Sequence, residues 1–177
     1  MSGEGTVIRA VEAADLAKTR QWRNDPRVAN PSLGRRFPIT EGGEREWFEG
    51  LGRGAFPTQL TWAVATEESS IVGLVQLRDI DWIHRTAEFG IWIGPEHWGQ
   101  GHATRATRLV CAHATRGLGL RQLRLRVVDG HDAAVTVYER NGFVREGLQR
   151  NAVLVDGRFA DLVLMVRDVA DLDDRVG

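Results

Sequence analysis

The chain has 177 residues, enough for one compact domain with a buried core. Its 23 basic and 24 acidic residues give a net charge of −1, which argues against a general nucleic-acid or membrane-surface binder. The single cysteine, Cys111, excludes an internal disulfide, and its apolar helical surroundings favour a buried hydrophobe over a nucleophile. The polar first residues lack a signal-peptide core and no apolar run reaches membrane-spanning length, so we expect a soluble, cytoplasmic protein.

The N-terminal third of the chain is predicted to hold one strand followed by two helices. The first helix is expected to stop before Pro26, because the residue before a proline avoids helical geometry. Thr40 is a candidate N-cap for the second helix. The predicted elements are a strand from Val7 to Ala10, a helix from Glu12 to Arg23, a loop from Ala29 to Pro38 and a helix from Thr40 to Leu51.

The remainder of the chain is predicted to be a series of strands interrupted by two helices. Turn signals at Glu67 to Ser70 and at Asp156-Gly157 indicate two hairpins, and Gly142 is a candidate C-terminal cap. Hairpins at both ends with a strand–helix–strand unit between them imply a single α/β domain, with a mixed sheet and helices on its faces. Its core is expected over 6–168, with a frayed tail after it. The predicted strands are Leu60 to Thr66, Ile71 to Arg78, Arg85 to Ile93, Gln122 to Val128, Phe143 to Leu154 and Phe159 to Val166, and the helices are Ala103 to Leu118 and Ala133 to Asn141.

A glycine loop joins the strand that ends at Ile93 to the helix that begins at Ala103. The first N–H groups of a helix have no internal partner and carry about half a positive charge. Gly99 and Gly101 would let an anion approach the backbone without a Cβ in the way. The pattern predicts a phosphate seat, although a tight strand-to-helix turn explains the loop equally well when it is taken alone.

Two common nucleotide-binding patterns do not fit this loop. It has no Gly-Lys-Ser/Thr sequence, which disfavours a Walker-type site. Thr104 stands where a dinucleotide fingerprint has its third glycine, and the next strand offers no acidic residue for a ribose. That strand instead carries Arg121, Arg124 and Arg126, which favour a solvated sheet edge over a phosphate-reading patch.

Four segments in chain order carry a more specific pattern: Trp22-Arg23-Asn24-Asp25-Pro26, the loop from Pro95 to Thr104, Tyr138-Glu139-Arg140-Asn141-Gly142-Phe143, and the hairpin from Asp156 to Asp161. Together they resemble the GNAT superfamily of acyl-CoA-dependent N-acetyltransferases, in the subfamily related to ribosomal-protein N-terminal acetyltransferases. The similarity covers essentially the whole chain. Trp98 replaces the Arg or Gln that begins the usual family loop, and this departure is itself typical of the subfamily.

The resemblance implies a mixed, mostly antiparallel sheet of about six to seven strands, with acetyl-CoA in the splay between two central strands and no metal. The loop would hold the pyrophosphate, and the preceding strand end would pair with the pantetheine arm. His131 stands where many members have a cofactor-binding asparagine, and a surface loop histidine explains it at least as well. The expected cofactor-binding residues are Ile91, Trp92, Ile93, Trp98, Gly99, Gln100, Gly101, His102, Ala103, Thr104 and His131.

Acetyl transfer from a thioester to an amine requires a base, a donor for the oxyanion and an acid for the leaving thiolate. Tyr138, the only tyrosine, matches the family's thiolate-protonating position, and the alternative is a core tyrosine with one satisfied hydroxyl. Glu88 is the candidate base, acting directly or through water, and the alternative is a sheet glutamate paired with an arginine. Asp161 and Glu46 are weaker candidates.

The resemblance therefore implies an N-acetyltransferase acting on a primary amine, such as a protein N-terminus, amino sugar, polyamine or antibiotic. The alternative is a non-catalytic acyl-CoA-binding or interaction module with the same fold, because fold does not determine function. A homodimer is expected as a possibility, and neither nucleic acid nor a membrane is expected as a partner. The near-neutral charge does not favour polycationic acceptors, although a local acidic patch could form from Asp79, Asp81, Glu44, Glu46 and Glu49.

Overall fold

The computed structural model describes residues 2–3, 5–29, 37–68 and 70–168. These residues form an eight-stranded sheet in the order β1-β2-β3-β4-β5-β6-β8-β7, in which β5 and β6 are parallel and the other neighbours antiparallel. The mixed, mostly antiparallel sheet confirms the expected fold, and the two residues of β1 account for the additional strand. The strands are β1 (Ser2–Gly3), β2 (Thr6–Arg9), β3 (Leu60–Ala65), β4 (Ile71–Asp81), β5 (Thr86–Ile93), β6 (Gln122–Val128), β7 (Val144–Val155) and β8 (Arg158–Asp168).

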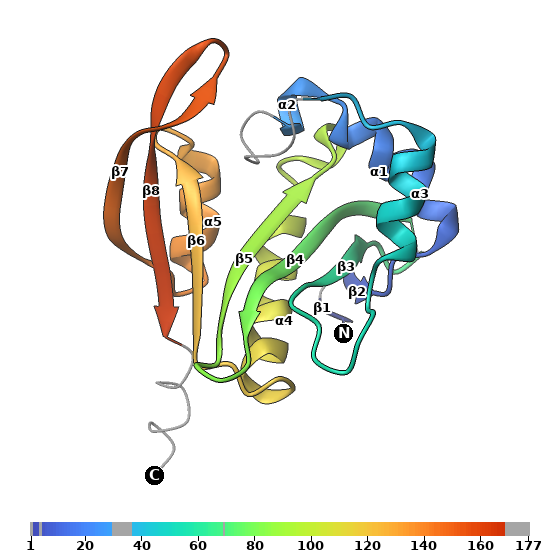
Figure 1. Ribbon diagram of the computed structural model, residues 1–177, viewed down its shortest axis with the longest axis horizontal. Coiled ribbons are helices and arrows are strands. Elements are labelled where there is room, and N and C mark those ends of the chain that lie inside the picture. The colour runs from blue at the N-terminus through green and yellow to red at the C-terminus, as the bar shows by residue number, and fades with distance from the viewer. Residues whose placement is uncertain (1, 4, 30–36, 69, 169–177) are drawn as a thin grey trace.

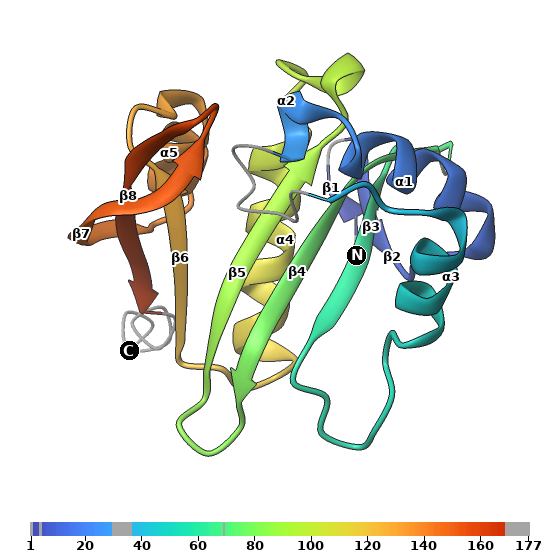
Figure 2. The same ribbon diagram turned by 45° about the horizontal axis from the view of Figure 1, so that its top comes forward.

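Helices cover both faces of the sheet, as expected. Figures 1 and 2 show α4 and α5 on one face, with α1 and α3 on the other. Within the described residues, no helix combines the length and apolar composition that crossing a bilayer requires. The helices are η1 (Ala13–Asp15), α1 (Leu16–Arg23), α2 (Pro26–Ala29), α3 (Glu41–Glu49), η2 (Pro95–His97), α4 (His102–Arg116) and α5 (Asp132–Arg140).

The larger hydrophobic core lies between the sheet and the pair α4–α5. The spacing of Ala106, Val110 and Ala114 places one stripe of α4 against the strands, and all three are fully buried. Cys111 is also fully buried in this core, which confirms its interpretation as a small hydrophobe. A smaller core around Leu74 packs under α3 on the opposite face.

The N-terminal helices differ in one respect from the prediction. The first helix stops where expected, but Pro26 begins the further helical turn α2. Proline suits a first helical position because its missing N–H would have no partner there, and the Asp25 carboxylate accepts from the N–H of Arg27 at 2.9 Å. Thr40 caps α3 as predicted, accepting from the N–H of Gly43 at 3.1 Å. Most of the loop predicted over 29–38 and the tail predicted after 168 lie outside the described residues.

The feature of the fold that positions the site is the fork between β5 and β6. The two strands pair only from Thr86 to Glu88, against Gln122 to Arg124. Beyond Glu88 they diverge, β5 remaining paired with β4 and β6 with β8, as both ribbon views show (Figures 1 and 2). The separation leaves one edge of β5 without a neighbouring strand.

Candidate active site

The unpaired edge of β5 presents the backbone of alternate residues to the fork. The N–H of Gly94 donates to the carbonyl of Val72 at 2.8 Å, on the β4 side. Backbone N–H and C=O groups of successive residues point to alternate edges of a strand. Those of Ile91 and Ile93 therefore point into the fork, whereas those of Trp92 point toward β4. Of the three cofactor-binding candidates on this strand, two therefore offer a free backbone edge.

Trp98 closes over the end of that edge. Its indole Nε1 donates to the carbonyl of Ile93 at 2.8 Å, and its side chain is 51% exposed. A carbonyl oxygen has two lone pairs, so this bond leaves room for a second donor. Trp98 thus lies beside the strand edge where the resemblance places the pantetheine arm.

The glycine loop has the backbone geometry that an anion-binding site needs. Gly99 and Gly101 adopt φ of +75° and +80°, in the left-handed region that favours glycine. Gly101 is the N-cap of α4 and supplies no side-chain cap, so the first N–H groups of the helix lack that partner. A Cβ added at Gly99 would meet no atom within 4 Å. The outer side of the loop is therefore open to an approaching anion.

His102 turns away from the outside of the loop. Its side chain is 7% exposed, and Nδ1 lies 3.0 Å from the hydroxyl of Thr6 on β2. The same hydroxyl accepts from Nε of Arg105 at 2.9 Å, which ties the start of α4 to the first long strand. Burial lowers the pKa of His102, with Arg105 acting in the same direction. Only the backbone of His102 is therefore available to a ligand at the loop.

Trp22 joins the first helix to the glycine loop, a link that the sequence did not reveal. Its indole is 1% exposed and packs against Gly94, where an added Cβ would overlap the ring. Indole Nε1 donates to the Glu96 carboxylate at 3.0 Å, and Glu96 pairs with Lys18 at 2.6 Å. The Lys18 ammonium is the main reason that the pKa of Glu96 falls to about 2. Two separate family segments thus form one structural unit.

Tyr138 lies on α5 at the point where the fork begins. Its ring packs edge-on against Phe89 at a centroid distance of 6.2 Å and against Phe143 at 5.9 Å. Tyr138 is 8% exposed, and burial raises the pKa of its hydroxyl to about 12, with the charge of Arg78 acting in the opposite direction. Within the described chain its hydroxyl makes no protein hydrogen bond. The hydroxyl therefore stays protonated at physiological pH.

Glu88 lies beside Phe89 on β5 but points to the opposite face of the sheet. Its carboxylate accepts from Nη2 of Arg78 at 2.8 Å and from Nη2 of Arg126 at 3.2 Å. The arginine-paired glutamate weighed as an alternative is therefore what the structure contains. Its side chain remains 19% exposed, so an acceptor or a water molecule has access to it.

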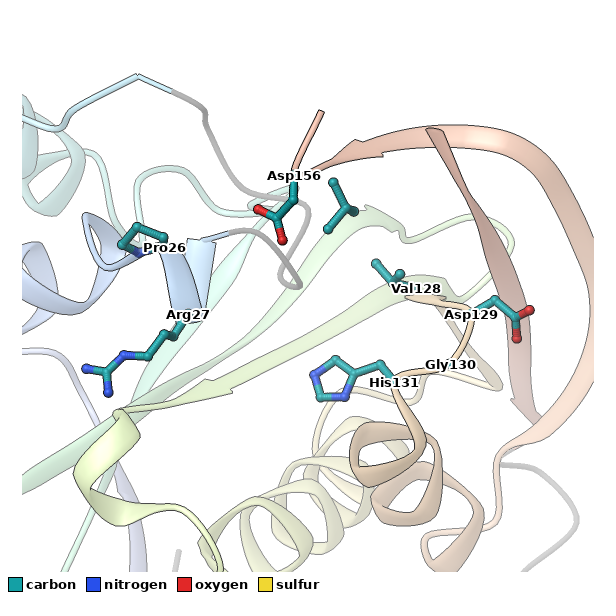
Figure 3. Close-up of a pocket in the computed structure, with 8 residues that line it drawn as sticks. Pro26, Arg27, Val128, Asp129, Gly130, His131 and Asp156 are labelled. Atoms are coloured by element: carbon teal, nitrogen blue, oxygen red, sulfur yellow. The ribbon is translucent and has the colours of Figure 1, made fainter. Parts of the chain in front are cut away.

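A cavity of about 530 Å³ lies at the open end of the fork. Figure 3 shows Pro26 and Arg27 of α2 on one side, with Val128, His131 and the turn residue Asp156 on the other. The imidazole of His131 points into this space from the N-cap position of α5. His131 is thus exposed to a ligand in the fork, where the cofactor-binding role was expected.

The remaining acidic candidates lie on other parts of the fold. Asp161 accepts from the N–H of Asn151 at 2.8 Å in the β7–β8 hairpin, and Glu46 is exposed on α3. Glu44 is 1% exposed and is bonded to Arg23, while Asp81 holds the turn after β4. The structure therefore does not bring these carboxylates together with Tyr138 and Glu88 at the fork.

The sequence profile of the acetyltransferase (GNAT) domain matches residues 6–144 of the chain. The chain therefore belongs to the GNAT acetyltransferase family. Its fold is close to that of the spermidine N-acetyltransferase from Vibrio cholerae in complex with CoA and spermine, with a TM-score of 0.87 and 26% identity over 95% of this chain and 98% of that chain.

Curated relatives include enzymes with two kinds of named acceptor. The chain is 36% identical over 104 residues to a spermidine N(1)-acetyltransferase of Vibrio cholerae, covering 59% of this chain and 60% of the relative. It is 34% identical over 96 residues to a putative ribosomal N-acetyltransferase of Bacillus subtilis, covering 54% and 52%. A ribosomal-protein-serine acetyltransferase of Escherichia coli is 27% identical over 101 residues, covering 57% and 56%. The matched stretches thus span between about half and three fifths of these relatives.

Proposed function

We propose that this protein is an acetyl-CoA-dependent N-acetyltransferase that moves an acetyl group directly to a primary amine. The observation that carries the proposal is the position of Tyr138, whose ring lies against Phe89 where β5 loses its pairing with β6. Tyr138 is at one end of the unpaired edge of β5 and the glycine loop is at the other end. This arrangement suits a long thioester that binds along the edge. Membership of the GNAT family and the CoA complex of its structural neighbour support this assignment.

The residues present fit the donor along its length. The uncapped start of α4 and the open side of Gly99 would receive the pyrophosphate. The free backbone edges of Ile91 and Ile93 would bind the pantetheine amides as an added strand would. Gln100, Ala103, Thr104 and His131 complete the proposed contacts, with His102 contributing only through its backbone.

Acetyl-CoA supplies the thioester whose carbonyl the neutral amine attacks. Glu88 would receive the proton of the acceptor ammonium, directly or through a water molecule, because it is the partly exposed carboxylate at the fork. The Tyr138 hydroxyl would then give its proton to the departing sulfur. The nitrogen would lose its second proton to solvent, from which the tyrosinate would recover a proton. The route needs no covalent bond between enzyme and acetyl group.

The acceptor is a primary amine, either a protein N-terminus or a small-molecule amine such as an amino sugar, a polyamine or an antibiotic. Relatives named for spermidine and for ribosomal acetylation support an amine acceptor. The cavity between α2 and the β7–β8 turn is the proposed entry for this acceptor. We expect the protein to act in the cytoplasm, and a homodimer remains a prediction.

The test is to incubate the purified protein with acetyl-CoA and a panel of amines while following the release of free thiol. Binding of acetyl-CoA is measured in parallel by calorimetry. Turnover with any member of the panel is the expected result and identifies the acceptor class. Binding without turnover across a broad panel would favour the alternative of a non-catalytic acyl-CoA-binding module.

A further inference from the structure

An excess of positive charge lies where β5 and β6 separate. Arg78 of β4 and Arg126 of β6 both bind the carboxylate of Glu88, so two guanidiniums share one carboxylate. The arginine side chains are 38% and 45% exposed, against 19% for Glu88. The cluster is therefore a positively charged patch that solvent and ligands can reach.

Much of the hydrogen-bonding capacity of the two guanidiniums is unused within the described part of the chain. Arg126 reaches Glu88 through Nη2 alone, at 3.2 Å from each carboxylate oxygen. Arg78 also uses Nη2 alone, at 2.8 Å, and its buried Nε has no protein partner there. A guanidinium offers five N–H donors in a planar fork that matches a carboxylate or a phosphate. Each arginine thus retains donors for a second anion.

The cluster lies beside the route that an acceptor must take. Arg126 and Val128 are two residues apart and share one face of β6, and Val128 lines the cavity at the mouth of the fork. Arg78 folds over Gly90 of β5, and its charge acts on the hydroxyl of Tyr138. Arg126 is therefore near the cavity along β6, and Arg78 lies over β5 near the start of the fork.

The positive charge of Arg78 and Arg126 would affect different classes of amine acceptor differently. At neutral pH every primary amine acceptor brings an ammonium group, whatever else the molecule carries. Acceptors differ in their second group, which is another ammonium in a polyamine and an anion in an amino acid. Arg78 and Arg126 repel the first kind and can form charge-assisted hydrogen bonds with the second.

We propose that Arg78 and Arg126 are specificity-determining residues, which select primary amines that carry a carboxylate or phosphate close to the nitrogen and disfavour polyamines. The inference rests on the proposed N-acetyltransferase function, and it narrows the acceptor class. The bonds from Arg126 to Glu88 are 3.2 Å long, against 2.8 Å for the bond from Arg78, and Arg126 is on the strand that leads to the cavity. Arg126 is therefore the residue proposed to contact the substrate anion, while Arg78 keeps Glu88 in place.

The test compares acceptors that differ in charge at one group. The pairs are β-alanine with β-alaninamide and phosphoethanolamine with ethanolamine, and spermidine represents the polyamines. In at least one pair, the wild type should have a higher kcat/KM for the anionic member than for its uncharged partner or for spermidine. The pair that shows this preference tells whether the selected group is a carboxylate or a phosphate. Arg126→Gln should lower kcat/KM for that anionic acceptor about tenfold to hundredfold more than for its uncharged partner, the usual cost of a charge-assisted hydrogen bond. Both acceptors share any effect that the substitution has through Glu88. Arg124→Gln is the matched control, because Arg124 lies on the same face of β6 but bonds to Gln122.

Two results would overturn the inference while the proposed function stood. One is a wild-type preference for spermidine over both anionic acceptors, and the other is an equal loss for both members of a pair in Arg126→Gln. If no amine is acetylated, the proposed function fails instead, and calorimetric binding of β-alanine and phosphoethanolamine to the CoA-loaded protein decides the inference. Weaker binding of either anion to Arg126→Gln than to the wild type would support it, and equal binding of both would overturn it.

Discussion

The ring of Tyr138 packs edge-on against Phe89, with 6.2 Å between the ring centroids, at the first residue of β5 beyond its pairing with β6. The preceding residue, Glu88, is the last paired one and faces the opposite side of the sheet. The proposed acid and base therefore approach one point of the fork from its two faces. A thioester threaded between the strands would lie within reach of both.

Titration of the only tyrosine tests how deeply Tyr138 is buried. Burial raises the pKa of its hydroxyl from the ordinary 10.0 to about 12. Between these pH values the folded protein keeps a proton that the unfolded chain loses, so the stabilisation present below pH 10.0 disappears as the pH rises toward about 12. We expect the near-ultraviolet phenolate absorbance to appear with a midpoint close to 12 in the native protein and close to 10 in denaturant. A native midpoint near 10 would show that the hydroxyl is exposed.

Substitution of Glu88 separates a catalytic base from a purely structural ion pair. A base contributes about a hundredfold to ten-thousandfold to the rate, so Glu88→Gln should lower kcat by a factor in that range. The acidic limb of the pH–rate profile should change as well, since the group that must lose its proton is gone. Reduced thermal stability with an unaltered pH–rate profile would instead assign to Glu88 only the role of holding Arg78 and Arg126.

Alanine substitutions in the glycine loop before α4 and in the turn after α4 form a matched pair. Gly99 and Gly119 both have positive φ, +75° and +66°, and a Cβ at either position would meet no atom within 4 Å. Alanine should therefore cost each position similar stability, about 1–2 kcal/mol of backbone strain. Only Gly99→Ala should weaken acetyl-CoA binding in calorimetry. Equal acetyl-CoA affinities in the two variants would contradict phosphate binding at the glycine loop.

The contact between Gly94 and Trp22 should be sensitive to a single methyl group. A Cβ at Gly94 would overlap the indole, so Gly94→Ala should destabilise the protein by about 1–3 kcal/mol, the usual cost of overpacking. Gly42→Ala on α3 is the control, because a Cβ there meets no atom within 4 Å and alanine favours helix. Denaturant unfolding measures both. Stability equal to the wild type in Gly94→Ala would show that Trp22 moves freely.

Local patterns predicted most of the fold. Alternation and turn residues placed the long strands, and periodicity placed the buried stripe of α4 that includes Cys111. The short helix α2 was missed because a proline marks a helix stop and a helix start equally well, and the carboxylate of Asp25 decides between them.

The site was less accessible to sequence reasoning, because its contacts join distant segments. Glu88 meets Arg126 from 38 residues away, and His102 meets Thr6 from 96 residues away. The backbone alternation that separates Trp92 from Ile91 and Ile93 depends on the register with β4. Such partners depend on strand pairing across the sheet, and no local spacing in the chain encodes it.

The most direct test of the account is the rate of free-thiol release by the wild type and by Tyr138→Phe, with acetyl-CoA and the best acceptor of the panel. If Tyr138 is the acid, kcat falls about a hundredfold or more, the scale of general acid catalysis, while acetyl-CoA affinity and thermal stability stay close to those of the wild type. An unchanged kcat in Tyr138→Phe would contradict the account, because the hydroxyl at the fork would then have no part in the reaction.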